Sequence, residues 1–260
     1  MSAADLITEL ASRGQYCFTT DEVVTASGSS LAAARAALRR LKQKGVVAMP
    51  YRGFHVIVPP EYRRLGCLPA DQFVPQLMKH IEQPYYVALL SAARYHGAAH
   101  QQPQSFQVMI AKNRPSITCG LVRILFVARR NVAEMPATRF NTPRGYVTVS
   151  SPEATAFDLV GYHKNAGGLD NVVTVLAELA ESLTAEALVA VANLSPAPWA
   201  QRVGYLLERV GAEQKAALLA RYVENSVNEN APLLPGRNLI GARRDARWKL
   251  SVNINVEPEA

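Results

Sequence analysis

The segment from Ser29 to Tyr62, SSLAAARAALRRLKQKGVVAMPYRGFHVIVPPEY, constrains the fold of this chain more than any other. Its first half carries apolar residues at steps of three and four, the spacing that gives a helix one buried face, and Gly45 follows as a stop. Two apolar runs, VVAMPY and FHVIV, come next, and Arg52-Gly53 joins them as a tight turn. The pattern predicts a basic helix followed by a β-hairpin. The expected inner face of the helix consists of Leu31, Ala34, Leu38 and Leu41.

Two shorter helices are expected before this segment. Residues 3–13, AADLITELASR, have apolar residues at helical spacing before Gly14. The run TTDEVVTASG begins with a threonine as N-cap and two acidic residues in the first turn, and it ends at Gly28. Helix, helix, turn, helix and hairpin is the order of a winged helix-turn-helix. We therefore expect residues 1–68 to form a winged helix-turn-helix DNA-binding domain.

The expected outer face of the third helix suits a DNA groove, because alanines lie near its start and Arg39 and Arg40 follow. Small residues let a helix enter a major groove about 12 Å wide, and arginine reaches guanine edges or phosphates. Arg52, at the hairpin tip, is expected at a minor groove or a phosphate. A plain solvated face explains the helix alone equally well, since alanine is the best helix former. The helix order and the basic hairpin tip favour DNA binding.

The distribution of charge supports an anionic partner for the first two thirds of the chain. The net charge is +7, from 28 basic and 21 acidic residues, and it divides into +4 over residues 1–68, +5 over 69–165 and −2 over 166–260. The basic residues of the middle segment allow three interpretations: solvated arginines at strand ends and turns, a second phosphate-binding surface, or a docking site for an acidic partner. They are Arg114, Arg123, Arg129, Arg130, Arg139 and Arg144.

The remaining residues, 69–260, are expected to form a second and larger domain. The patterns predict helices over 71–81 and 84–97 and a helix capped by Ser151 with Pro152 in its first turn. Between 105 and 150 they predict β-rich runs that are separated by connecting stretches over 113–120 and 141–145. Helical patterns continue from Leu169 to Asn225, and a strand is expected over 248–256. The expected fold class is α+β: an N-terminal winged helix-turn-helix followed by a larger mixed α/β domain with a small sheet and a helical C-terminal part.

No motif in the sequence argues for catalysis, a metal or a cofactor. His96 and His100 have the spacing of two ligands on one helix face, but Gly97 stands where a zinc protease needs glutamate. Glycine-rich phosphate loops and nucleophile elbows are missing from the sequence. Glu153 and Asp158 lie five residues apart, a poor spacing for a carboxylate pair. We therefore expect a protein that is not an enzyme and that has no catalytic residues, no metal and no cofactor.

The cellular compartment expected from the sequence is the cytoplasm. Three cysteines are odd in number and far apart, which does not suggest a disulfide framework. No apolar run approaches the roughly 18 residues of a membrane helix. The first ten residues, MSAADLITEL, lack the basic start of a signal peptide.

Taken in order, these pieces resemble the AbiEi-type antitoxins of bacterial toxin–antitoxin operons. The resemblance covers nearly the whole chain and depends on the order of the pieces, with the C-terminal ones carrying the assignment. The matching segments are FTTDEVVTASGSSLAAARAALRRLKQKGVV, YRGFHVIVPPEY, PYYVALLSAARYHGAAHQQP, VSSPEATAFDLVGY, VGYLLERVG and RWKLSVNINVEP.

The resemblance implies a two-domain repressor and antitoxin of a type IV toxin–antitoxin pair. In the family the winged helix binds inverted repeats in double-stranded promoter DNA and represses its own operon. Because an inverted repeat requires two protomers with matched spacing, we expect a monomer or a weak dimer that pairs on the DNA. The C-terminal domain, here 69–260, counters a co-encoded nucleotidyltransferase-like toxin, usually without a stable complex. The family offers no catalytic residues to transfer. The DNA-binding role transfers to Ser29, Ser30, Arg35, Arg39, Arg40, Lys42, Lys44 and Arg52.

Within that set, Ser29, Arg35, Arg39 and Arg40 are expected nearest base edges, and Lys42, Lys44 and Arg52 on phosphates. Two other functions stay open from the sequence. One is a nucleic-acid-processing enzyme that uses the winged helix as a substrate grip. The other is a plain regulator whose C-terminal domain senses a ligand or partner.

Overall fold

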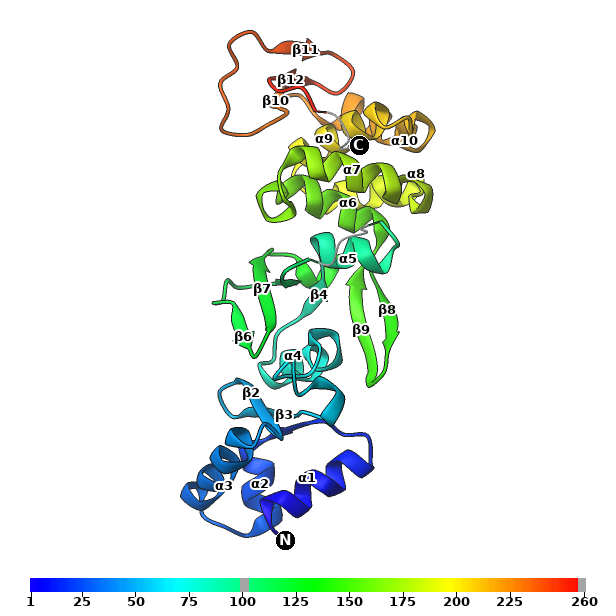
Figure 1. The fold of residues 1–260 in the computed structure, drawn as a ribbon. Helices are drawn as coiled ribbons and strands as arrows, with labels where there is room; N and C mark the ends of the chain where they lie inside the picture. Colours follow the sequence, from blue (N-terminus) through cyan, green and yellow to red (C-terminus); the bar gives the residue numbers. More distant parts are fainter. Residues whose placement is uncertain (99–102, 257–260) are drawn as a thin grey trace. The chain divides into compact units, whose positions relative to one another are not determined.

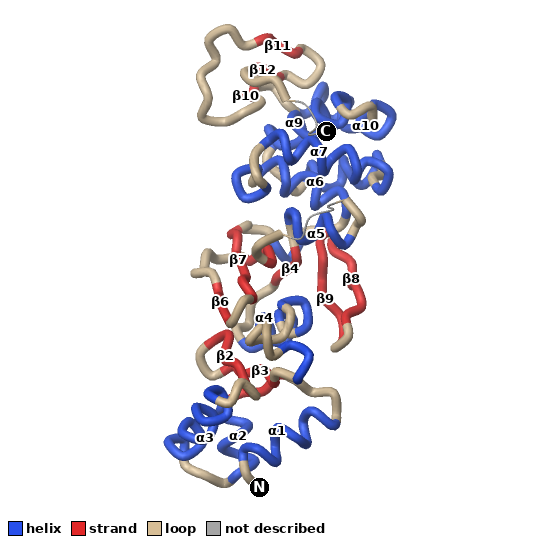
Figure 2. The backbone as a smooth tube through the Cα atoms, viewed as in Figure 1, coloured by secondary structure: helices blue, strands red, loops and turns tan. Residues whose placement is uncertain are grey.

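The fold is that of a computed structural model, which describes residues 1–98 and 103–256. These residues form two compact units, whose helices and strands are labelled in Figure 1 and distinguished by colour in Figure 2. The first unit consists of Met1–Tyr86, Gln104–Val132 and Arg139–Thr148, and the second holds the remaining described residues. Because the chain passes from one unit to the other more than once, neither unit is one continuous stretch of sequence.

The first unit begins with the predicted helices and hairpin, shown in dark blue to light blue in Figure 1. The hairpin strands pair antiparallel, and a short strand before the second helix adds to the hairpin, giving the order β1–β3–β2. This is the arrangement of a winged helix. Its elements are α1 Ala3–Ser12, β1 Cys17–Thr19, α2 Thr20–Ser27, α3 Leu31–Gln43, β2 Val47–Tyr51 and β3 Phe54–Ile57.

Local capping explains where these helices begin and end. Thr19 and Glu22 form a capping box, in which each side chain accepts a hydrogen bond from the other residue's backbone N–H. Gly28 ends α2 with a φ of 61°, in the left-handed region that glycine adopts without strain. The side chain of Ser30 then accepts a hydrogen bond from the N–H of Ala33 and caps α3.

The inner face predicted for α3 is confirmed at Ala34 and Leu38, which are buried, but the prediction is wrong for Leu31. Leu31 is 42% exposed. It lies two turns before Leu38 on nearly the same side of the helix, in the first turn, which the core does not cover.

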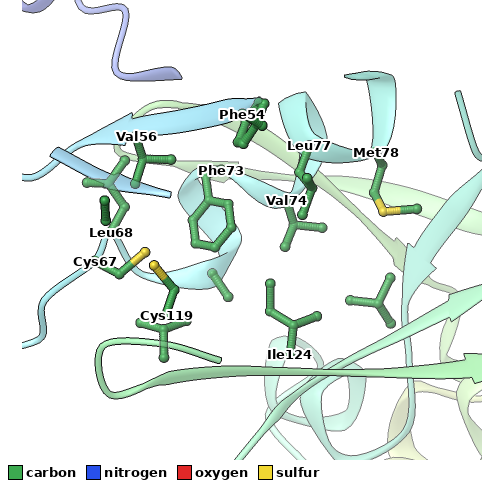
Figure 3. Packing of buried hydrophobic residues seen from close by; sticks show 14 of the residues in the cluster. Phe54, Val56, Cys67, Leu68, Phe73, Val74, Leu77, Met78, Cys119 and Ile124 are labelled. Carbon is green, nitrogen blue, oxygen red and sulfur yellow. The ribbon is translucent and has the colours of Figure 1, made fainter. Parts of the chain in front are cut away.

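Two apolar cores stabilise the first unit. One packs the three helices against the hairpin and includes Phe18, Val23 and Leu38. The other, shown in Figure 3, packs Phe54 and Val56 of the hairpin against Phe73, Leu77 and Ile124. In this second core the sulfur atoms of Cys67 and Cys119 point toward each other. Residues on both sides of position 68 therefore share a core, and the domain division 1–68 and 69–260 stays a prediction.

A six-stranded mixed sheet has the order β6–β7–β5–β4–β9–β8. Strands β5 and β7 are parallel, with Phe106 opposite Ile124, and β6 is antiparallel to β7. The first unit also contains α4, Val74–His80, whose residues join the core of Figure 3. The strands are β4 Tyr85–Val87, β5 Phe106–Ile110, β6 Ile117–Cys119, β7 Val122–Ala128, β8 Ala137–Thr142 and β9 Gly145–Ser150.

The single helix predicted over 84–97 is wrong, because strand β4 comes first and helix α5, Leu89–Tyr95, follows. Tyr85, Tyr86 and Val87 are aromatic or β-branched residues that favour a strand, and Val87 pairs with Val149 of β9. Leu89 has a φ of 55°, so the backbone turns sharply between strand and helix. Strand β6 was also not expected, since the sequence analysis took residues 113–120 as a connecting loop.

The second unit contains the predicted helical part. Its helices are α5, α6 Pro152–Gly161, α7 Leu169–Leu179, α8 Ala185–Asn193, α9 Ala197–Arg209 and α10 Glu213–Ser226. A small sheet follows, with the order β10–β12–β11, formed by Ala231–Pro232, Leu250–Val252 and Arg243–Asp245 respectively. The α+β fold class predicted from the sequence is confirmed.

The strand predicted over 248–256 is shortened to Leu250–Val252. The cause is Asn253, whose side chain accepts a hydrogen bond from the N–H of Leu234 (2.9 Å) and donates one to the carbonyl of Leu234 (3.0 Å). A side chain thus satisfies the backbone groups that a longer strand would have paired.

Candidate nucleic-acid interface

A groove of about 740 Å³ lies between α3 and the hairpin in the first unit. One wall is the side of α3 that carries Leu31, Arg35 and Lys42, and the other is formed by Met49 and the hairpin tip. Each wall follows from the local sequence: the helix repeats every 3.6 residues, and Arg52-Gly53 turns the hairpin back on itself.

The groove is strongly basic. Arg35, Arg39 and Lys42 of α3 and Arg52 of the hairpin tip line it, and all four side chains belong to exposed residues. Asp21, at the start of α2, is the acidic residue of the lining. Four permanent cations against one carboxylate make a surface that attracts a polyanion.

Neighbouring arginines of α3 have different positions. Arg39 lines the groove, whereas Arg40 is exposed but lies outside the lining. The two side chains differ by about 100° around the helix axis, which separates the groove side of the helix from its far side. Sequence reasoning had treated them as equivalent.

The other predicted DNA-binding residues also lie outside the groove lining. The hydroxyl of Ser30 caps α3, and that of Ser29 is 2.7 Å from the hydroxyl of Ser27. Lys44 follows the last turn of α3 and is exposed. Of the eight predicted residues, the groove therefore brings together Arg35, Arg39, Lys42 and Arg52.

Two hydrogen bonds fix the hairpin against α2. The N–H of Thr20 donates to the carbonyl of Gly53 (2.9 Å), and the hydroxyl of Thr20 lies 2.9 Å from Nε2 of His55. Burial, together with the nearby charge of Lys42, lowers the pKa of His55 from 6.5 to about 4. The ring is therefore neutral at physiological pH and adds no charge to the groove. Its role is to hold the hairpin against the start of α2.

Nine residues of the lining were not predicted from the sequence, among them Leu31, Met49, His55 and His80. Met49 could have been found from strand alternation, because its neighbours Ala48 and Pro50 are buried while Met49 faces outward. No local signal points to His80, since its helix reaches the hairpin only through the tertiary fold.

Several arginines of the middle segment are engaged within the first unit. Arg114, which lies between β5 and β6, donates a hydrogen bond to the hydroxyl of Tyr51 in β2 (2.6 Å). This bond links the hairpin to the segment between the two strands. The guanidinium of Arg144 lies 3.8 Å from the ring centre of Tyr16 and 3.7 Å from a carboxylate oxygen of Glu61. Arg129 is buried and donates to the side chain of Asn131. These three side chains support the fold, which favours the structural interpretation for them.

The carboxylate pair considered for catalysis is buried, and one member has a structural role. Oε1 of Glu153 accepts hydrogen bonds from the N–H (3.0 Å) and hydroxyl (3.3 Å) of Thr184, the residue before α8. Asp158 is fully buried. Nε2 of His96 lies 2.7 Å from the carbonyl of Ser150, and its expected companion His100 lies outside the described residues.

Residues 1–98 and 103–256 contain no group of three or more histidine, cysteine or acidic side chains arranged to hold a metal ion. Over the same residues, none of the helices is long and apolar enough to cross a bilayer.

The fold and the groove define the class: a winged helix-turn-helix protein with a second, largely helical unit. Residues 5–58 match a family model described as "Transcriptional regulator, AbiEi antitoxin", and residues 86–209 match the "AbiEi antitoxin C-terminal domain". These matches cover most of the chain, so it belongs to the AbiEi antitoxin family. The resemblance found in the sequence is thereby confirmed, together with an antitoxin and regulator role.

A solved structure supports the fold over nearly the full length. The crystal structure of the RV2827C protein from Mycobacterium tuberculosis is similar, with a TM-score of 0.67 and 19% sequence identity. The match covers 95% of this chain and 90% of that one. No curated protein matches the chain.

Proposed function

We propose that this protein is a DNA-binding transcriptional repressor of its own operon and the antitoxin of a type IV pair with a nucleotidyltransferase-like toxin. The observation that supports DNA binding is the basic groove beside an exposed helix face in a regulator-type winged helix. The match of residues 86–209 to the antitoxin C-terminal domain supports the second role.

In this proposal α3 enters the major groove of promoter DNA. Ala32, Ala33 and Ala36 are exposed, so the outer side of the helix is narrow enough to approach the bases. Arg39 lies between this side and the basic groove, in the best position for a guanine edge. Lys42 and Arg52 neutralise phosphates on the hairpin side, and Arg40 reaches the backbone on the far side.

The proposed operator is an inverted repeat. One winged helix reads one half-site, so two protomers bind with the spacing that the two half-sites set. The protein is a monomer or a weak dimer that pairs on the DNA. It counters its toxin through the second unit, without needing a stable complex.

The test compares the binding of Arg39→Ala and Arg40→Ala to two duplexes. One comes from the region upstream of the protein's own gene, and the other has a scrambled sequence. One bidentate arginine–guanine contact discriminates by about 1–3 kcal/mol, so Arg39→Ala loses roughly 5- to 150-fold of the preference for the promoter duplex. Arg40→Ala keeps that preference, because its contact is to the backbone. Arg40→Ala reduces the magnitude of the slope of log K against log salt by about 1, because one phosphate contact is lost, whereas Arg39→Ala leaves the slope nearly unchanged.

The measurement is fluorescence anisotropy at several salt concentrations. A double Arg39/Arg40 alanine variant that binds the promoter duplex as tightly as the wild type would refute DNA recognition by α3. Co-expression with the toxin tests the antitoxin role separately: Arg39→Ala loses repression but still restores growth. Failure of the wild-type chain to restore growth would instead favour a plain regulator.

A further inference from the structure

Two large apolar side chains are exposed inside the basic groove. Leu31, in the first turn of α3, is 42% exposed, and Met49, in the middle of β2, is 41% exposed. Both line the groove, Leu31 from α3 and Met49 from β2. Apolar side chains of this size usually lie in a core, and exposed ones gathered in one hollow indicate a binding site.

The cations around these side chains identify the kind of ligand. Arg35, Arg39, Lys42 and Arg52 line the same groove, so its occupant is anionic as well as partly apolar. Duplex DNA combines both properties, because phosphates form the groove edges and the C5-methyl group of thymine is the apolar group on the major-groove floor.

The position of Leu31 fits contact with a base. In helix-turn-helix proteins the N-terminal residues of the recognition helix meet the base edges. Leu31 is the first residue of α3, and Ser30 fixes this end of the helix by capping it. Met49 comes from the hairpin, and its flexible thioether can follow the shape of the surface against it.

We propose that Leu31 and Met49 read thymine methyl groups, so that the chain prefers thymine at defined positions of its site. This inference rests on the proposed DNA-binding function and names the residues that add apolar readout to it. Arginine contacts alone would select guanine. The two apolar residues let the same surface also select thymine, independently of the arginine contacts.

The test replaces thymine by deoxyuridine, which removes the methyl group and keeps the base pairing. The probe is a duplex that the full chain selects from a random-sequence pool, and each thymine is replaced in turn. We expect one or two replacements to weaken wild-type binding about three- to fivefold, the worth of one buried methyl group. Leu31→Ala or Met49→Ala binds the thymine and deoxyuridine duplexes equally at the position its side chain contacts.

The controls separate this inference from the proposed function. Arg40→Ala keeps the full response to deoxyuridine, because its side chain lies outside the groove, and Leu31→Met keeps most of it. A wild-type chain that selects a duplex but ignores every deoxyuridine replacement overturns methyl readout and leaves the repressor proposal standing. A chain that selects no sequence at all overturns both. Since Leu31 is exposed, thermal unfolding should show Leu31→Ala to be as stable as the wild type.

Discussion

His55 connects the stability of the winged helix to pH. Its ring stacks on Phe18 at a centroid distance of 5.3 Å and bonds Thr20, and burial with nearby Lys42 lowers its pKa to about 4. An unfolded chain protonates the same ring near 6.5. Between these values the unfolded state binds more protons, so the stabilisation is complete above about pH 6.5 and is lost as the pH falls toward 4.

We expect His55→Gln to reduce the dependence of unfolding free energy on pH in this window. One proton contributes at most about 1.4 kcal/mol per pH unit, and the difference in slope between wild type and variant should be a fraction of that value. Urea unfolding of both chains between pH 4 and 7 measures it. Burial also lowers the pKa of His96 and His163, which remain in the variant and therefore cancel in the comparison. Equal slopes would show that His55 is not held neutral by the fold.

At the scale of single residues, the sequence predicts those features that depend on residues close by in the chain. The threonine cap of α2 and the turn at Gly28 involve groups only a few residues apart. The separation of Arg39 from Arg40 could not be predicted, because it depends on which side of α3 the hairpin covers. For the same reason Leu31 was assigned to the core, although it lines the groove.

A glycine in α9 positions the small C-terminal sheet of the second unit. A side chain at Gly204 would collide with the ring of Trp248, which is fully buried and donates a hydrogen bond to Glu208 (2.8 Å). The rigid indole thus packs directly on the helix backbone, just before strand β12. The contact secures the sheet to α9.

Gly204→Ala should therefore destabilise the chain by about 3 kcal/mol, although alanine is the better helix former. In a Trp248→Leu background the same change should cost almost nothing, because the ring is gone. Chemical denaturation of the four chains of this double-mutant cycle gives the coupling. If Gly204→Ala lowered the free energy of unfolding equally in both backgrounds, the collision with the Trp248 ring would not be the cause of the destabilisation.

At the scale of elements, the sequence predicts those whose signals are local and continuous. Helix α6 has Ser151 as its cap and Pro152 in its first turn, and it was found. Strand β4 was not, because its partner residue Val149 is distant in the sequence and a three-residue strand carries little pattern. The short strand β6 was missed because three residues carry little pattern, although its partner β7 follows directly in the sequence.

The apolar core shared across position 68 governs how the whole molecule can be divided. Phe54 and Val56 pack with Phe73, Leu77 and Ile124, which a fragment of residues 1–68 lacks. We expect this fragment to expose that apolar face, to melt well below the full chain and to bind 1-anilinonaphthalene-8-sulfonate. Differential scanning calorimetry and dye fluorescence of fragment and full chain measure this. A fragment that unfolds cooperatively at the temperature of the full chain would establish residues 1–68 as an independent domain.

The two proposed activities, repression and toxin neutralisation, are accordingly better separated by substitutions in the groove than by truncation. Arg39 is exposed and supports no core, so Arg39→Ala changes the basic groove alone. The sequence predicts two functions along this chain but not the interleaving of its two units, since contacts between distant segments leave no local signature.

The interleaved first unit also affects how the protein is made. A ribosome releases the hairpin before the strand that carries Ile124, and Arg144, which stacks on Tyr16, later still. During that interval the apolar face of the hairpin that carries Phe54 and Val56 contacts water or a chaperone instead of Ile124. The nascent chain therefore completes the unit that contains the basic groove only after more than half of its codons have been translated.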